Sequence, residues 1–147
     1  MPGRSEDVGD LESRLGRVDE ARGLYDRALA LHEKEQAGLG QANTLQSIGD
    51  AARLTGRYAE AAAIYQRALL LYAREQDPVG TAYTYAELSR SLHALGEDAN
   101  RDAALEQALH WARRSNTDSV LRYVQAALVE VTGGHEQAEA WMASRMR

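Results

Sequence analysis

Residues 41–80 read QANTLQSIGDAARLTGRYAEAAAIYQRALLLYAREQDPVG, and this stretch decides the fold. Its apolar residues recur with the 3.6-residue spacing of an amphipathic helix over residues 41–54 and again over residues 58–75. Thr55 and Gly56 separate the two segments, and glycine is the usual residue just past a helix end because it accepts a positive φ. The stretch therefore predicts two helices joined by a short turn.

The preceding stretch repeats this pattern. When residues 9–40 are set against residues 49–80, a shift of 40 without a gap, 14 of the 32 positions are identical. The identities include the turn glycines Gly16 and Gly56, and a further shift of 40 reaches Gly96. A fixed period of about 20–50 residues indicates a repeat architecture.

Composition limits the classes of protein that fit. A chain of 147 residues, 44% of them apolar, has room for one domain with a core, which we place at residues 1–147. No apolar run is long enough to span a membrane, and the start MPGRSEDVGD is no secretory signal, so we expect a cytoplasmic protein with no membrane partner. The absence of cysteine excludes disulfides and thiol catalysis, and the net charge of −5 argues against nucleic-acid binding.

The periodicity predicts an all-α chain of four helical hairpins. We expect helices at about residues 7–15, 18–36, 41–54, 58–75, 81–95, 99–114, 119–131 and 136–146, with a loop at 37–40. The corresponding repeats are at about 2–40, 41–80 and 81–117, followed by a degenerate or capping repeat at 118–147.

Small and aromatic residues stand at fixed places in these units. In the second unit they are Gly49, Gly56, Tyr58, Ala61, Tyr65 and Ala68, and in the first they are Gly9, Gly16, Ala21, Tyr25 and Ala28. Small residues on facing helices let the two helix axes approach, and the aromatic rings fill the flanks. This pattern resembles the tetratricopeptide repeat. The 40-residue period resembles the longer-helix subclass of cell-polarity adaptors, kinesin light chains and MalT-like bacterial regulators.

The resemblance implies a right-handed α-solenoid that serves as a non-catalytic scaffold for protein–protein interaction. It weakens towards the C-terminus. Ser89 replaces the glycine of the third unit, Arg101 replaces its alanine, and the fourth unit keeps only Ala126, Gly133 and Ala138. Apolar residues near the C-terminus would suit a further repeat or self-association through the last helix; they are Trp141, Met142 and Met146.

In such a solenoid the first helix of each pair lines the concave side. The residues that we expect in a partner-binding groove there are Asp10, Asn43, Gln46, Asp50, Arg53, Tyr83, Glu87, Arg90, His93 and Tyr123, flanked by Glu6, Ser13, Ala127 and Glu130. Arg53, Arg90 and His93 would form a basic middle, complementary to a carboxylate of an extended peptide. Tyr58, Tyr65 and Tyr72 are interpreted as core residues.

No motif indicates catalysis, a cofactor or a metal. The four histidines show no H-E-x-x-H spacing, and His135 with Glu139 supplies too few ligands for a metal site. The carboxylate clamp of some family members is not expected either, because Asp10 and Asp50 stand where it would need asparagine. Two functions stay open: a scaffold that binds a peptide or helix of a partner protein, and a sensory or regulatory module of a bacterial signalling or transcription protein that binds a peptide pheromone or small ligand.

Overall fold

The computed structural model describes the backbone of residues 2–145 and the side chains of residues 16–145. The described chain is all-α. Its helices are α1 (Pro2–Lys34), α2 (Gly38–Leu54), α3 (Tyr58–Arg74), α4 (Pro78–Ala94), α5 (Asp98–Ser115), α6 (Asp118–Thr132) and α7 (His135–Arg145).

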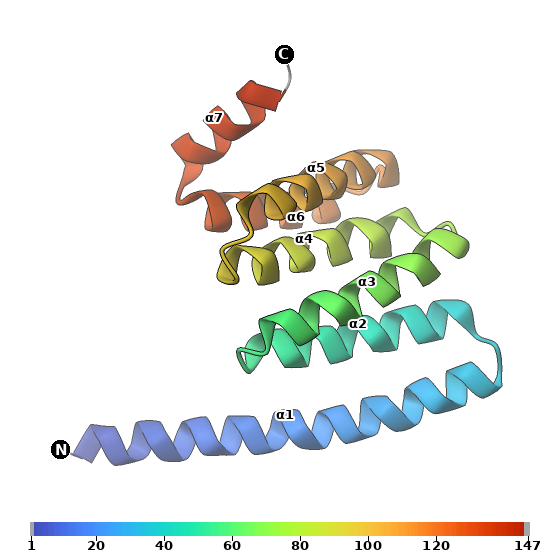
Figure 1. Cartoon of the computed structure of the whole chain (residues 1–147), viewed down its shortest axis with the longest axis vertical. Helices are drawn as coiled ribbons and strands as arrows, with labels where there is room; N and C mark the ends of the chain where they lie inside the picture. Colours follow the sequence, from blue (N-terminus) through green and yellow to red (C-terminus); the bar gives the residue numbers. More distant parts are fainter. Residues whose placement is uncertain (1, 146–147) are drawn as a thin grey trace.

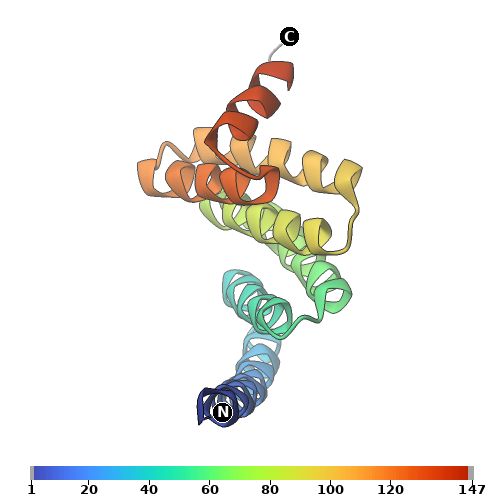
Figure 2. The same cartoon turned by 90° about the vertical axis from the view of Figure 1, so that its left-hand side faces the viewer.

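The chain runs from α1 at one end of the stack to α7 at the other, and α6 packs against both α4 and α5 (Figures 1 and 2). The pairs α2/α3 and α4/α5 pack closely, and α7 contacts α6 less extensively. Helix α4 also contacts α2, α3 and α6. The first helices of the three pairs, α2, α4 and α6, therefore form one side of the stack. This arrangement confirms the expected all-α, solenoid-like fold, whereas its right-handed superhelix stays a prediction.

The first unit differs from the expected hairpin, because α1 runs unbroken through Gly16 (Figure 1). The two helices expected at residues 7–15 and 18–36 are therefore one helix, and the described chain has seven helices instead of eight. Glycine allows a turn but does not force one, and a glycine inside a helix costs only about 1 kcal/mol.

Composition gives a physical reason for this difference. The core-facing positions of α2 are Ala42, Leu45, Ile48 and Ala52, and the residues 40 positions earlier are Pro2, Ser5, Val8 and Glu12. One apolar residue of four is too little surface to hold a helix folded back on its neighbour.

The other expected helices are present, and their ends differ from the expected ones by at most three residues. The loop expected at residues 37–40 is shorter, since α2 already begins at Gly38. Asp77 begins α4 by accepting hydrogen bonds from the backbone N–H groups of Val79 and Gly80, with Pro78 at the first helical position. Gly56 and Gly96 have positive φ angles of 79° and 75° and end α2 and α4 as the sequence predicts.

Close packing explains why glycines recur with the repeat. A Cβ atom at Gly49 would lie 2.6 Å from the ring of Tyr65, so only glycine lets α2 and α3 approach this closely. The rings of His32 and Tyr72 press in the same way against Gly40 and Gly80, which are also 40 residues apart. The sequence identity between the units thus corresponds to repeated contacts.

At the other end, Trp141 and Met142 of α7 pack against the core formed by α4, α5 and α6. The indole N–H of Trp141 donates to Asp102 Oδ1 at 3.0 Å, and the Arg145 guanidinium covers the indole at 3.9 Å from the ring centroid. Trp141 and Met142, which we expected as candidates for self-association, therefore make packing contacts within the chain. Met146 lies outside the described residues.

Candidate functional site

Polar side chains gather where α2, α4 and α6 lie side by side. On α2, residues 43, 46, 50 and 53 follow each other at helical spacing and share one face. Residues 83, 87 and 90 do the same on α4, and Tyr123 and Glu130 face them from α6. We call the surface made by Asn43, Gln46, Asp50, Arg53, Tyr83, Glu87, Arg90, Tyr123 and Glu130 the polar groove.

Glu87 is the centre of the polar groove and is fully buried. Arg53 Nη2 on α2 lies 2.6 Å from its Oε2 atom, while Arg90 of the same helix and the hydroxyl of Tyr123 on α6 donate to Oε1. A buried carboxylate must be paired and hydrogen-bonded to offset the loss of water. Glu87 meets this requirement with donors from three helices, so it connects three successive units.

Arg90 extends the network to the edge of the groove. Its Nε atom donates to Glu130 Oε2 at 2.8 Å and its Nη1 atom donates to the Tyr123 hydroxyl at 2.7 Å. Burial raises the pKa of the Tyr123 hydroxyl, and the nearby Glu87 carboxylate raises it further. Tyr123 therefore stays protonated and remains a donor over the physiological pH range.

Asp50 lies beside this network and has an unusual protonation behaviour. Its carboxylate accepts hydrogen bonds from the hydroxyls of Tyr65 and, at 3.5 Å, Tyr83. Burial raises the pKa of the Asp50 carboxyl to about 6, the hydrogen bond from Tyr65 opposes the rise, and the charge of Glu87 adds to it. Asp50 thus titrates close to neutral pH.

A cleft of about 340 Å³ opens at one end of the groove, between α2 and α6. The rings of Tyr83 and Tyr123 stack in it, with centroids 4.7 Å apart and planes inclined by 27°. The hydroxyl of Tyr72 donates to Asn43 Oδ1 at 2.5 Å, and Gln46 lies next to both. The remaining lining residues are Asp77, Val79, Gly80, Ser119 and Val120. The cleft therefore combines amide groups, tyrosine hydroxyls and aromatic faces.

Most residues expected in the groove meet there, and the exceptions are clear. His93 lies near the end of α4, where its Nδ1 atom is 3.1 Å from Arg101 Nη1 on α5. Ala127 is buried in the core instead of facing the groove, and Ala126, expected at a packing position, is exposed. Glu6, Asp10 and Ser13 have side chains outside those described.

The expected basic middle is not a free cationic patch. Both Arg53 and Arg90 are paired with Glu87, and Arg90 also pairs with Glu130. His93 points to another part of the molecule. The two arginines are thus engaged with carboxylates of the chain itself, and the expectation that the three side chains bind a peptide carboxylate stays a prediction.

Sequence reasoning missed the hydroxyls of Tyr65 and Tyr72. Both rings are buried as expected for core residues, but their oxygen atoms reach the groove and bond Asp50 and Asn43. A signal was present, since the chain has seven tyrosines and no phenylalanine. A core that needed only aromatic volume would not select a hydroxyl on every ring.

Within residues 2–145 no helix is long and apolar enough to cross a membrane. The described side chains also contain no group of three histidine, cysteine or acidic residues arranged to hold a metal ion.

The comparison with protein families agrees with the geometry. Residues 4–74 match the family model described as tetratricopeptide repeat. A search of curated proteins gave no match. The matched residues include α2 and α3, which pack closely where Gly49 meets the ring of Tyr65. The family match over residues 4–74, just under half of the chain, and the stacked helix pairs together support a tetratricopeptide repeat protein.

Proposed function

We propose that this protein is a non-catalytic scaffold that binds an extended peptide or a helical segment of a partner protein in the polar groove. Tetratricopeptide repeats are in general protein–protein interaction modules. The observation that carries the proposal here is the open cleft beside Tyr83 and Tyr123, on the side of the stack formed by the first helices.

The cleft suits a peptide backbone. The side chains of Asn43 and Gln46 each carry a carbonyl oxygen and an amide group, so together they can pair with a main-chain N–H and C=O. The stacked rings of Tyr83 and Tyr123 offer a flat apolar surface to one side chain of the partner. Aromatic anchors surrounded by polar groups are typical of the energetic centres of protein interfaces.

Charge narrows the kind of segment further. The two arginines of the groove are paired with the carboxylates of Glu87 and Glu130. Asp77 lines the cleft and Asp50 lies near it. A segment with a basic or neutral residue at the cleft is therefore complementary, and an acidic residue there would be repelled.

The second candidate is a regulatory module that takes a short peptide or a small ligand. The size of the cleft supports this second candidate, because its volume of about 340 Å³ falls within the roughly 300–1,000 Å³ of small-molecule sites. The two functions differ in the partner, which is a folded protein in the first and a diffusible, heat-stable molecule in the second.

Affinity capture from a native-source lysate separates them when it is run with a variant that fills the cleft. Ser119→Trp adds a large side chain at the exposed rim of the cleft without removing a contact of the network. Arg67→Trp is the matched control, because Arg67 is exposed on α3 outside the groove. A protein recovered by wild type and by Arg67→Trp but lost with Ser119→Trp would support the scaffold.

Equal recovery by all three proteins would place binding outside the cleft. The small-ligand function is measured in parallel, as a rise in melting temperature on addition of a boiled and ultrafiltered extract. A rise in wild type and Arg67→Trp that is absent in Ser119→Trp would favour the second candidate.

A further inference from the structure

One face of α1 carries a row of apolar side chains in which two leucines are largely exposed and two alanines are partly buried. The row consists of Ala21, Leu24, Ala28 and Leu31, with the 3-4-3 spacing of a coiled-coil seam. The side chains of Leu24 and Leu31 are 63% and 52% exposed. We call these four residues the α1 stripe.

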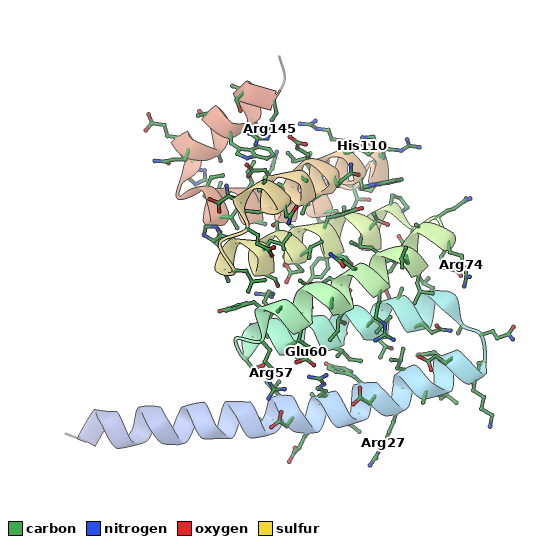
Figure 3. The ribbon with its side chains drawn as sticks, viewed as in Figure 1. Arg27, Arg57, Glu60, Arg74, His110 and Arg145 are labelled. Atoms are coloured by element: carbon green, nitrogen blue, oxygen red, sulfur yellow. The ribbon has the colours of Figure 1, made fainter. Side chains whose placement is uncertain are left out.

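The α1 stripe is distinct from the face by which α1 joins the stack. Tyr25 packs with Leu29 against the core of α2 and α3, and Arg22 bonds Glu60 of α3. Figure 3 shows the two sides clearly: Glu60 and Arg57 lie between α3 and α1, whereas Arg27 beside the stripe points away from the stack. A second helix can therefore reach the stripe without meeting α3.

The corresponding face of α3 shows what such a stripe requires. Forty residues further along, the same positions hold Ala61, Ile64, Ala68 and Leu71, and the first three are buried. Ile64 and Ala68 are covered by Ala42, Leu45 and Ile48 of α2. Since α1 is one continuous helix over Pro2–Lys34, no helix within these described residues folds back on the α1 stripe as α2 does on α3.

The order of residues in the stripe fits a second copy of α1 running antiparallel. Around a two-fold axis beside residue 26, Ala21 lies opposite Leu31 of the partner subunit and Leu24 lies opposite Ala28 of the partner subunit. Each layer then combines one large and one small side chain, which fills space evenly. A parallel pair would set Leu24 against Leu24 and Ala28 against Ala28, leaving crowded and empty layers in turn.

Charge supports the same arrangement. Arg17 and Glu35 follow the stripe at its two ends, each four residues from its last apolar member, and both are exposed. In the antiparallel pair Arg17 reaches Glu35 of the partner subunit, and by symmetry this happens twice. On the edge of the stripe, Glu20 and Lys34 of the partner subunit bring opposite charges together in the same way. Near the axis, Arg27 meets the partner's Arg27, which is a pair of like charges.

We propose that two copies of this chain form an antiparallel dimer through the α1 stripe. The interface is isologous, with each subunit giving the same surface to the other. It is small, with four apolar residues from each subunit and one pair of like charges, so dimerisation is weak and depends on concentration. The polar groove is not part of this interface.

The test is the mass of the full chain in solution, measured by sedimentation equilibrium over a range of concentrations. Wild type is expected to pass from monomer to dimer as its concentration rises. Leu24→Glu puts a charge opposite Ala28 of the partner subunit and is expected to remain a monomer. Leu70→Glu is the control, because Leu70 is 75% exposed on α3, outside the stripe, and this variant should associate like wild type.

A charge exchange tests the antiparallel register. Arg17→Glu should weaken dimerisation by about two- to thirtyfold, because two exposed ion pairs worth about 0.2–1 kcal/mol each are lost. The double variant Arg17→Glu/Glu35→Arg restores opposite charges at both ends and should recover the wild-type association. A parallel dimer would not show this recovery, since residues 17 and 35 would not meet.

The helical content of every variant is checked by circular dichroism, so that loss of association is not confused with loss of fold. A wild type that stays monomeric at the highest concentration reached would overturn the proposal. A dimer that persists unchanged in folded Leu24→Glu would overturn it as well, because the contact would then lie elsewhere. The closing of α1 into a hairpin, which would cover the stripe from within, would appear as a strict monomer.

Discussion

The guanidinium of Arg53 on α2 lies 2.6 Å from the carboxylate of Glu87 on α4, and that carboxylate also receives Arg90 and Tyr123. A first helix of one repeat is thus tied to the first helix of the next through a buried charge. Because the donors come from three helices, the ion cluster contributes to how the units are oriented relative to each other.

Glu87→Gln is expected to destabilise the fold strongly. It removes the negative charge and leaves Arg53 and Arg90 facing each other with side chains only 20% and 15% exposed. Removal of one partner from a buried ion pair lowers the free energy of unfolding by about 3–5 kcal/mol. We expect a decrease near the lower end of this range because the arginine side chains remain partly exposed to solvent. Urea unfolding followed by circular dichroism measures it.

Glu130→Gln is the matched control for that experiment. Glu130 pairs with the same Arg90 but is 61% exposed, so its loss should cost less than about 1 kcal/mol. Equal losses in the two variants would contradict the view that Glu87 holds the network together.

Asp50 makes stability depend on pH in a defined direction. Its pKa is raised in the folded protein to about 6, above the ordinary value near 3.8, so the folded state holds the proton more tightly than the unfolded state. The stabilisation of the folded state by this tighter proton binding is present below pH 4 and is lost as pH rises from 4 to 6. Asp50→Asn keeps an oxygen acceptor for Tyr65 and removes the titration.

We therefore expect the variant to gain stability relative to wild type between pH 4 and pH 7, by up to about 3 kcal/mol for a shift of this size. Unfolding of both proteins at several pH values measures the difference between their free energies of unfolding. The contributions of the other titrating groups largely cancel in this difference. A difference that is constant over this range would show that Asp50 titrates normally.

Ala61→Leu is expected to lower the melting temperature. Ala61 is fully buried where α3 meets Ala52, and overpacking of such a contact costs about 1–3 kcal/mol. Ala63→Leu, at an exposed position two residues away on the same helix, should change the melting temperature little. An unchanged melting curve for Ala61→Leu would refute the packing register.

Gly16 and Gly56 distinguish a continuous α1 from a hairpin. Gly16 lies inside a helix with open space around it, so Gly16→Ala should stabilise the helix by about 1 kcal/mol. Gly56 has a φ angle of 79°, so Gly56→Ala should destabilise by about 1–2 kcal/mol. Thermal unfolding with far-ultraviolet circular dichroism measures both. Destabilisation by both variants would indicate that the chain turns at Gly16 as it does at Gly56.

The contrast between these glycines also marks what the sequence could predict. Periodicity and turn residues predicted six of the seven helices closely, because Gly56, Gly96 and Gly133 adopt the positive φ angles expected at helix ends. Gly16 has the same surroundings in sequence, but the segment before it has too few apolar residues to pack back. A motif gives the local possibility of a turn, and the amount of burial on both sides decides whether it forms.

The groove shows a similar limit. Helical spacing correctly placed Asn43, Gln46, Asp50 and Arg53 on one face of α2, since that follows from the geometry of a single helix. Helical spacing did not predict the ion pair between Arg53 and Glu87, because this pairing depends on the distance between α2 and α4. The cleft depends in the same way on Gly80, which leaves room for the ring of Tyr72.

The central place of α4 has a consequence for the order in which the protein loses its structure. This helix contacts α2, α3, α5 and α6, whereas α7 is held by α6 and a few side chains of α5. A helix that packs against fewer neighbouring helices opens locally at a lower free energy. The backbone amides of α7 will therefore exchange their hydrogens for deuterium early, and those of α4 only when the whole stack opens.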